Sequence, residues 1–186
     1  LIFRGDGKIH ADNTDGYGFI ANLRQNAPDW NATAGPVAVF GAGGGARAVI
    51  AALLEIGAPE IRLANRTRPR AEALRREFGA KVTVCDWVQG GNMLDGAMTV
   101  VNTSPLGMDG KPDFKVPLDA LSPKATVTDL VYTPLRTKFL EDAAAAGCVT
   151  VDGLGMLLHQ AAPGFERWFG VRPEITDATR EAVLGP

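Results

Sequence analysis

The segment best suited to hold a ligand is a glycine-rich run, Gly41-Ala42-Gly43-Gly44-Gly45-Ala46, which fits the pattern G-x-G-x-x-A. It follows the apolar run 37–40 and opens the helix-forming stretch 46–56. The first glycine permits a tight turn, the second lets the backbone approach a pyrophosphate, and the small sixth residue lets helix and strand pack closely. The free amides and positive dipole end of the helix would then face the anion. In this strand–turn–helix context, dinucleotide binding is favoured over a bland turn.

A second polar segment, Asn65-Arg66-Thr67-Arg68-Pro69-Arg70, ends the next apolar run. A site selective for NAD would carry an Asp or Glu here, on the ribose 2′-hydroxyl. The chain instead has an Asn and several arginines, and guanidinium groups are shaped to hold a phosphate bidentately. The alternative is a solvated basic turn that caps the following helix. The segment favours NADP(H) as the cofactor.

Two further loops have residue types that suit a cofactor. Thr103 and Ser104 follow the apolar run 98–102, where short polar side chains could meet a ribose or an amide; a capped turn is the alternative. Asp152-Gly153-Leu154-Gly155-Met156 opens a later helix. Its two glycines suggest close backbone approach to a ligand, with Met156 as an apolar surface for a flat ring. A core methionine at an ordinary helix start is the alternative.

The histidines and cysteines offer little chemistry. His159 lies on an apolar helix and is more readily a structural residue than an acid or base, and His10 has no better claim. Cys85 and Cys148 are expected to be free thiols rather than a bridge. With these four residues widely spread, no metal cluster is expected.

The elements that must position these residues alternate along the chain. A β-hairpin is predicted at the start of the chain, where the runs 1–4 and 8–11 flank Gly5-Asp6-Gly7. The polar residues 12–14 predict the N-terminal cap of a first helix. Strands alternating with helices imply right-handed crossovers and an α/β fold, a Rossmann-like doubly wound parallel sheet with flanking helices. The expected strands are 37–40, 61–64, 81–85, 98–102, 125–130 and 149–151, and the expected helices are 17–26, 46–56, 70–78, 137–146, 153–169 and 177–184.

Composition excludes several classes of protein. The 186 residues carry 19 Lys+Arg against 21 Asp+Glu, for a net charge of −2, so a nucleic-acid protein with a basic face is not expected. No apolar run reaches the length of a membrane span. Hydrophobic residues make up 46%, enough for a proper core in one domain with an appendage.

Taken in order, the motifs resemble those of one family, shikimate dehydrogenase, an NADP-dependent reductase of aromatic amino-acid biosynthesis. The resemblance covers nearly the whole chain. It comprises Asp12-Asn13-Thr14-Asp15-Gly16, Gly41–Ala46, Asn65-Arg66-Thr67 with Arg70, Asn102-Thr103-Ser104, Asp129 to Tyr132, and Asp152-Gly153-Leu154-Gly155-Met156 with Gln160.

The resemblance implies reversible hydride transfer between NADPH and the C3 carbonyl of 3-dehydroshikimate, which gives shikimate. In this family a Lys–Asp pair does the proton chemistry, and Asp15 matches the Asp. From position alone Asp15 is a helix-start acid that suits the helix dipole. The Lys and most substrate contacts belong to an N-terminal domain with no counterpart here. We therefore expect a fragment that binds NADP(H) but is poorly active.

The same resemblance implies a ligand contact for individual residues. One of them is Leu130, at a position where the family often has Met. The resemblance places Asp15, Tyr132 and Gln160 at the substrate, Leu130, Gly153 and Met156 against the nicotinamide, Gly41, Ala42, Gly43, Gly44 and Gly45 at the pyrophosphate, and Asn65, Arg66, Thr67 and Arg70 at the 2′-phosphate, with Thr103 and Ser104 beside the cofactor.

The chain is expected to have three parts: residues 1–30, a hairpin and helix that link to the absent substrate domain; 31–152, the NADP-binding domain; and 153–186, helices that pack back toward the substrate cleft. Two other functions stay open, a quinate/shikimate dehydrogenase that uses NAD and a non-catalytic NADP-binding regulatory module. Substrate-facing groups such as Asp15 and Gln160 argue against the second. The resemblance also implies a cytoplasmic enzyme, without a nucleic-acid or membrane partner, and leaves a homodimer open.

Overall fold

The computed structural model describes residues 2–3 and 7–185 of the chain. At the start, β1 (Ile2–Phe3) pairs antiparallel with β2 (Ile9–His10), with Ile2 opposite His10. This confirms the predicted pairing, whereas most of the predicted turn at 5–7 lies outside the described residues.

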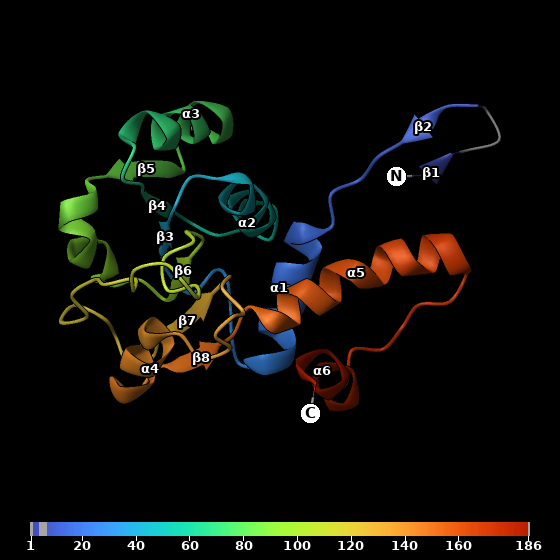
Figure 1. Cartoon of the computed structure of the whole chain (residues 1–186). Helices are drawn as coiled ribbons and strands as arrows, with labels where there is room; N and C mark the ends of the chain where they lie inside the picture. The colour runs from blue at the N-terminus through green and yellow to red at the C-terminus, as the bar shows by residue number, and fades with distance from the viewer. Residues whose placement is uncertain (1, 4–6, 186) are drawn as a thin grey trace.

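A parallel sheet lies on one side of the molecule, and the N-terminal hairpin extends away from it (Figure 1). The strand order of this sheet is β5-β4-β3-β6-β7-β8, so the order reverses between β3 and β6. This is the predicted doubly wound arrangement, and ligands bind such sheets beyond the carboxyl ends of the strands at the point of reversal. The strands are β3 (Val37–Phe40), β4 (Ile61–Ala64), β5 (Val82–Cys85), β6 (Thr99–Asn102), β7 (Thr126–Asp129) and β8 (Val149–Val151).

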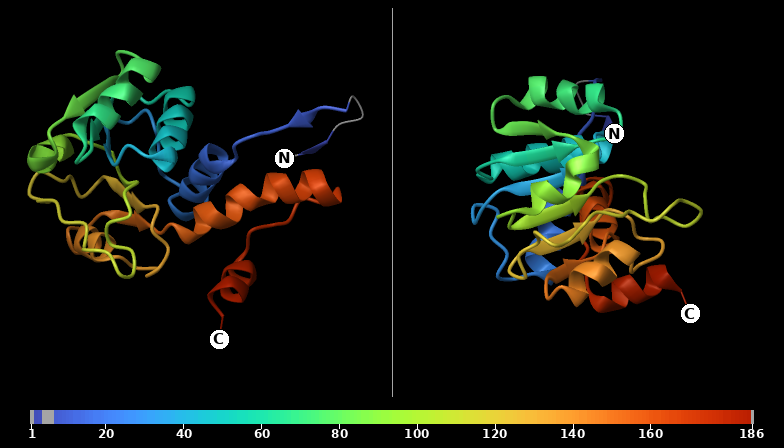
Figure 2. Two further views of the ribbon diagram at one scale, coloured as in Figure 1. Left: turned by 45° about the horizontal axis from the view of Figure 1, so that its top comes forward. Right: turned by 90° about the vertical axis from the view of Figure 1, so that its left-hand side faces the viewer.

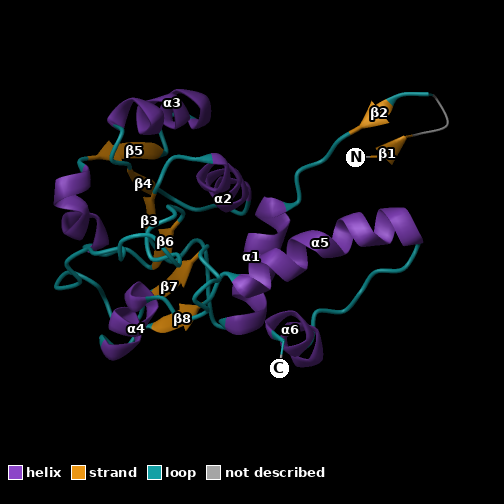
Figure 3. Ribbon diagram, viewed as in Figure 1, coloured by secondary structure: helices purple, strands orange, loops and turns teal. Residues whose placement is uncertain are grey.

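Each face of the sheet is covered, which explains why the central strand β3 is apolar throughout. Val37 and Val39 of β3 pack with one cluster, which includes α1 (Asp15–Asn26), α2 (Gly44–Glu55) and α3 (Arg68–Phe78). Ala38 and Phe40 face the other cluster, with the 3₁₀ segment η1 (Trp87–Leu94) and α4 (Lys138–Ala145). Figure 3 shows helices on both sides of the strands.

A second helical layer lies outside the sheet and its covering helices, where α5 (Leu154–Phe169) packs against α1. Glycines let the two helices approach. A Cβ on Gly18 would come 2.8 Å from the Gln160 nitrogen, and one on Gly155 would come 1.8 Å from Asn22 Oδ1. Close packing of the two helices therefore explains why residue 155 is a glycine. The sequence had suggested close approach of a ligand instead.

The last helix, α6 (Asp177–Leu184), lies on the opposite side of α5 from the hairpin (Figure 2). None of its residues is buried. Gln25 Nε2 donates to the Ile175 oxygen at 2.8 Å and so holds the segment before α6, while Arg180 of α6 donates to Asp152 Oδ2 at 2.7 Å.

Several helix starts differ from the expected ones. α3 begins two residues early, at Arg68, because Pro69 fits the first helical turn, where no amide donor is needed. The first helix also begins early, at Asp15, with Thr14 in the cap position. Thr14 makes no side-chain cap bond, and Asn13 Oδ1 instead accepts from the Asp15 amide at 2.9 Å.

Candidate active site

The point of strand reversal brings the glycine loop beside the loop that follows β6. Thr103 donates to the Phe40 oxygen twice, from its backbone nitrogen at 2.7 Å and from Oγ1 at 2.9 Å. Gly41 has a φ of +115°, and a Cβ there would come 2.5 Å from Thr103 Oγ1. Only glycine therefore fits at 41, and Thr103 fixes the base of the turn instead of standing free.

The next two glycines leave the start of α2 open. Gly43 is the N-cap residue, with extended backbone, and neither it nor Gly44 would bring a Cβ within 4 Å of another atom. No side chain caps this helix and its first turn holds no acid. The first amides and the positive end of the dipole thus face open space, which is the arrangement that binds anions.

Of the arginines after β4, two are available to a ligand. Arg68 is occupied, since it pairs with Asp86 and with Glu72. Arg66 and Arg70 are exposed and have no ion pair within the described part of the chain. The turn itself is shaped by Asn65 Nδ2, which donates to the Thr67 oxygen at 2.9 Å.

A buried polar network, which the sequence did not predict, fixes the loops after β6 and β7. Asn102 Nδ2 donates to Asp129 Oδ1 at 2.9 Å, and Thr137 Oγ1 donates to Asp129 Oδ2 at 2.8 Å. Asn102 Oδ1 accepts from Ser104 Oγ at 2.7 Å, so Ser104 is held within this network. Burial raises the pKa of Asp129 to about 6, although bonds from the Val131 amide, Thr137 and Asn102 oppose that shift.

Leu130 lies between the glycine loop and the start of α5. Its Cδ2 is 3.0 Å from the place of a Cβ on Gly45, and a Cβ on Gly153 would come 2.5 Å from its backbone oxygen. Met156 is only 8% exposed and packs in the core on the α1 side. The structure thus favours the core role that the sequence offered as the alternative for Met156.

The three residues expected at the substrate come from three different elements. Asp15 is the first residue of α1 and is partly exposed. Gln160 of α5 lines a cavity of about 320 Å³, and Thr14, next to Asp15, lines the same cavity. Tyr132 lies in the loop after β7, is 45% exposed and does not line that cavity.

The structure gives His159 a packing role. Its Nε2 lies 2.7 Å from Gln25 Oε1, which ties α5 to α1. Partial burial, with a smaller effect of Arg172, lowers its pKa, so the ring is neutral at physiological pH. This agrees with the structural interpretation of His159.

The sequence also made predictions about the cysteines, possible metal ligands and helix lengths. Cys85 and Cys148 are free thiols, as predicted, and burial raises the pKa of each. Among the described residues, no group of three His, Cys, Asp or Glu side chains is placed to hold a metal ion. Within the same part of the chain, every helix is too short or too polar to cross a membrane.

Family models match two stretches of the chain. Residues 23–103 match shikimate/quinate 5-dehydrogenase, and residues 153–184 match the C-terminal domain of shikimate 5′-dehydrogenase. Among solved structures, the quinate dehydrogenase of Corynebacterium glutamicum in complex with NAD is similar with a TM-score of 0.87 and 31% identity, over 98% of this chain and 66% of that one. The shikimate 5-dehydrogenase of Thermus thermophilus in complex with NADP(H) and shikimate gives a TM-score of 0.78 and 35% identity, over 92% and 62%.

Curated relatives are closer in sequence. The shikimate dehydrogenase (NADP(+)) of Cereibacter sphaeroides is 77% identical over 99% of this chain, which spans 66% of that relative's length. The enzyme of the same name from Roseobacter denitrificans is 62% identical over 100% of this chain and 67% of its own length. With the glycine loop, the free arginines and the Asp15 segment placed as described, this chain belongs to the shikimate dehydrogenase family.

Proposed function

We propose that this chain carries the cofactor-binding half of an NADP-dependent shikimate dehydrogenase. One observation carries the proposal: the uncapped start of α2 lies next to the segment after β4, where Arg66 and Arg70 make no ion pair with any residue that the structure describes. The first suits a pyrophosphate and the second a 2′-phosphate. Relatives that bear the name shikimate dehydrogenase (NADP(+)) support the choice of cofactor.

The cofactor would be held along the carboxyl ends of the strands. The amides of residues 41–45 would take the pyrophosphate, residues 65–67 with Arg70 the 2′-phosphate, and the loop at Thr103 and Ser104 the neighbouring ribose or amide. Leu130 with Gly153 would support the nicotinamide, with Met156 behind them. When bound, NADP(H) supplies or accepts the hydride.

The substrate side would use Asp15, Tyr132 and Gln160. A carboxylate at the start of α1 can accept a hydrogen bond from a substrate hydroxyl and hold the proton that leaves it. The reaction we propose for the whole protein is the reversible reduction of 3-dehydroshikimate to shikimate, in the cytoplasm. Because this chain spans 66% of its first relative and the family's lysine has no matching position, we expect it to bind cofactor and turn over poorly.

The test is calorimetric titration of the chain with NADP⁺ and, separately, NAD⁺. We expect NADP⁺ to bind at least about tenfold more tightly, a difference of about 1.4 kcal/mol. The double variant Arg66→Ala/Arg70→Ala should remove that preference and leave NAD⁺ binding unchanged, while Arg24→Ala, an exposed arginine of α1, serves as the control.

Equal binding, or a preference for NAD⁺, would contradict the phosphate clamp. It would favour the second candidate, a quinate/shikimate dehydrogenase that uses NAD, which the structural similarity to the NAD-bound quinate dehydrogenase supports. The regulatory-module alternative makes a different prediction. The complete protein would then bind NADP⁺ without oxidising shikimate, whereas the proposed enzyme would lose its turnover only when Asp15→Ala is introduced.

A further inference from the structure

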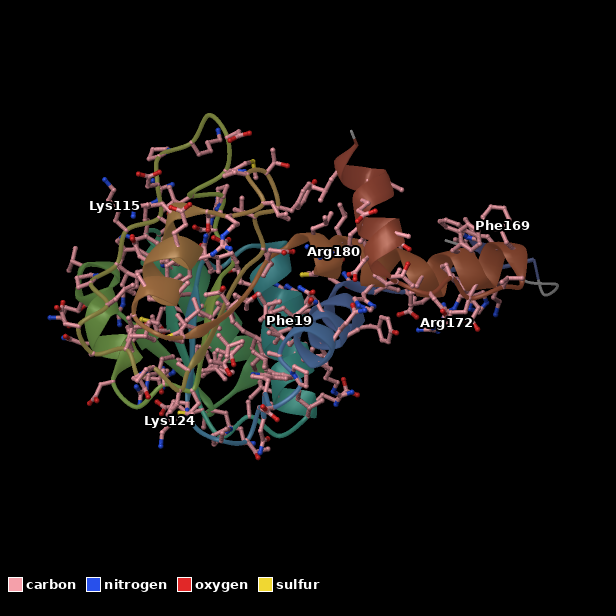
Figure 4. All side chains as sticks on the ribbon, turned by 90° about the horizontal axis from the view of Figure 1, so that it is seen from below. Phe19, Lys115, Lys124, Phe169, Arg172 and Arg180 are labelled. Carbon is pink, nitrogen blue, oxygen red and sulfur yellow. The ribbon has the colours of Figure 1, made fainter. Side chains whose placement is uncertain are left out.

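One ion pair ties α6 to the turn at the start of α5. The helix buries none of its residues, and its apolar side chains Val183 and Leu184 are about half exposed. Arg180 Nη2 lies 2.7 Å from Asp152 Oδ2, and these side chains are 21% and 24% exposed. No other ion pair among the described residues is as well covered on both sides. Figure 4 shows Arg180 between α6 and the first part of α5.

The partner of Arg180 shapes the start of α5. Asp152 Oδ1 accepts from the Leu154 amide at 3.0 Å, so this carboxylate caps the helix from the residue before Gly153. The backbone oxygen of Asp152 accepts from Asn22 Nδ2 at 2.7 Å, which fixes the same turn to α1. One carboxylate oxygen therefore holds the turn while the other is held by α6.

The turn so fixed lies against the loop after β7. A Cβ on Gly153 would meet the Leu130 oxygen at 2.5 Å and the Val131 oxygen at 2.7 Å, so the two backbones are in direct contact. Leu130 in turn reaches the glycine loop at Gly45. Any rotation of the Asp152 carboxylate would thus shift the backbone at Gly153 and, through it, Leu130.

We propose that Arg180 is a positioning residue for the nicotinamide half of the cofactor site. The inference rests on the proposed function, in which Gly153 and Leu130 support the nicotinamide. Arg180 acts through Asp152. Without the guanidinium, a partly buried carboxylate loses its charge partner, turns toward water and releases the Leu154 amide. The adenosine half is untouched, because Asn65–Arg70 follows β4 whereas Asp152 follows β8, and three strands separate β4 from β8.

The experiment compares two ligands on the same chain, NADPH and adenosine 2′,5′-bisphosphate, which lacks the nicotinamide. For Arg180→Met we expect NADPH to bind about fivefold more weakly, as loss of a helix cap would predict, and the bisphosphate to bind as before. The fluorescence of bound NADPH, which reports the surroundings of the nicotinamide, should fall toward that of the free cofactor. Arg180→Lys should keep part of the NADPH affinity. Asp152→Ala, which removes the acceptor of the Leu154 amide, should reproduce the loss without adding to that of Arg180→Met.

The matched control is Arg24→Met, on the exposed side of α1, which should leave both ligands unchanged. Equal weakening of both ligands by Arg180→Met would show a general structural role and overturn the proposal. Unchanged NADPH binding and fluorescence in that variant would overturn it too, while leaving the proposed function intact. Failure of the unaltered chain to bind either ligand would overturn the proposed function, and this inference with it.

Discussion

Asp129 is a buried carboxyl group that hydrogen bonds hold in place. Its folded-state pKa of about 6 lies above the ordinary value of 3.8, because burial disfavours the charge more than its three donors favour it. The folded protein therefore holds this proton more tightly than the unfolded chain does. Asp129 makes the free energy of unfolding fall as pH rises from about 4 to about 6, by about 2 kcal/mol over that interval.

The variant Asp129→Asn should lose this contribution. An amide oxygen can still accept from the Val131 amide and from Asn102, and it carries no charge at any pH. We expect denaturant unfolding between pH about 4 and about 6 to show a more positive slope of stability with pH than the parent chain. Asp119→Asn, at an exposed position, should leave the slope as it was, and a parental slope in Asp129→Asn would contradict the account.

Residue by residue, the site could be predicted only in part. The spacing of Gly41 and Gly43 predicts pyrophosphate binding. The position of Arg66 and Arg70 after a strand predicts binding of the 2′-phosphate. That Arg68 is taken by Asp86 could not be predicted, because the partner follows a different strand and meets Arg68 only when β4 and β5 pair. The Asn102–Asp129 network is hidden for the same reason, since these polar residues end two neighbouring strands.

Among the elements, apolar runs between turn residues could be predicted closely. β3, β4 and β8 have the expected bounds, because each is a short run of mostly β-branched or apolar residues that ends at a glycine or a polar residue. The segment η1 was not predicted, since a 3₁₀ helix with two glycines shows no period of 3.6 residues. Contact between α1 and α5 depends on Gly18 and Gly155, whose partners are more than a hundred residues away in sequence.

A pair of variants on α5 tests that contact. Gly155→Ala would drive a Cβ to 1.8 Å from Asn22 Oδ1, so the helices must separate, and we expect a loss of about 1–3 kcal/mol. Gly164→Ala, on the same helix, would meet nothing closer than 3.8 Å and should stabilise the chain by about 0.5–1 kcal/mol. Thermal unfolding of both variants measures the difference. A Gly155→Ala chain as stable as the parent would mean that α5 does not lie against Asn22 as described.

At the scale of the whole molecule, the two proposed ligands contact different amounts of the chain. The proposed cofactor residues belong to a sheet with two buried cores, whereas the proposed substrate residues come from the first turn of α1, one loop and the middle of α5. A ligand stabilises a fold only in proportion to its binding to the folded state. The cofactor should therefore stabilise this chain strongly and shikimate hardly at all.

Thermal unfolding in the presence of each ligand measures this asymmetry. NADP⁺ at about a hundred times its dissociation constant should add about 2.7 kcal/mol of stability. Shikimate alone should add nothing measurable, and shikimate added to the NADP⁺ complex should neither raise the unfolding temperature further nor produce NADPH. The Arg66→Ala/Arg70→Ala variant should lose most of the response to NADP⁺, which ties that response to the site. Formation of NADPH from shikimate by the 186-residue chain would show that Asp15, Tyr132 and Gln160 suffice for turnover, and would overturn the expectation of a poorly active chain.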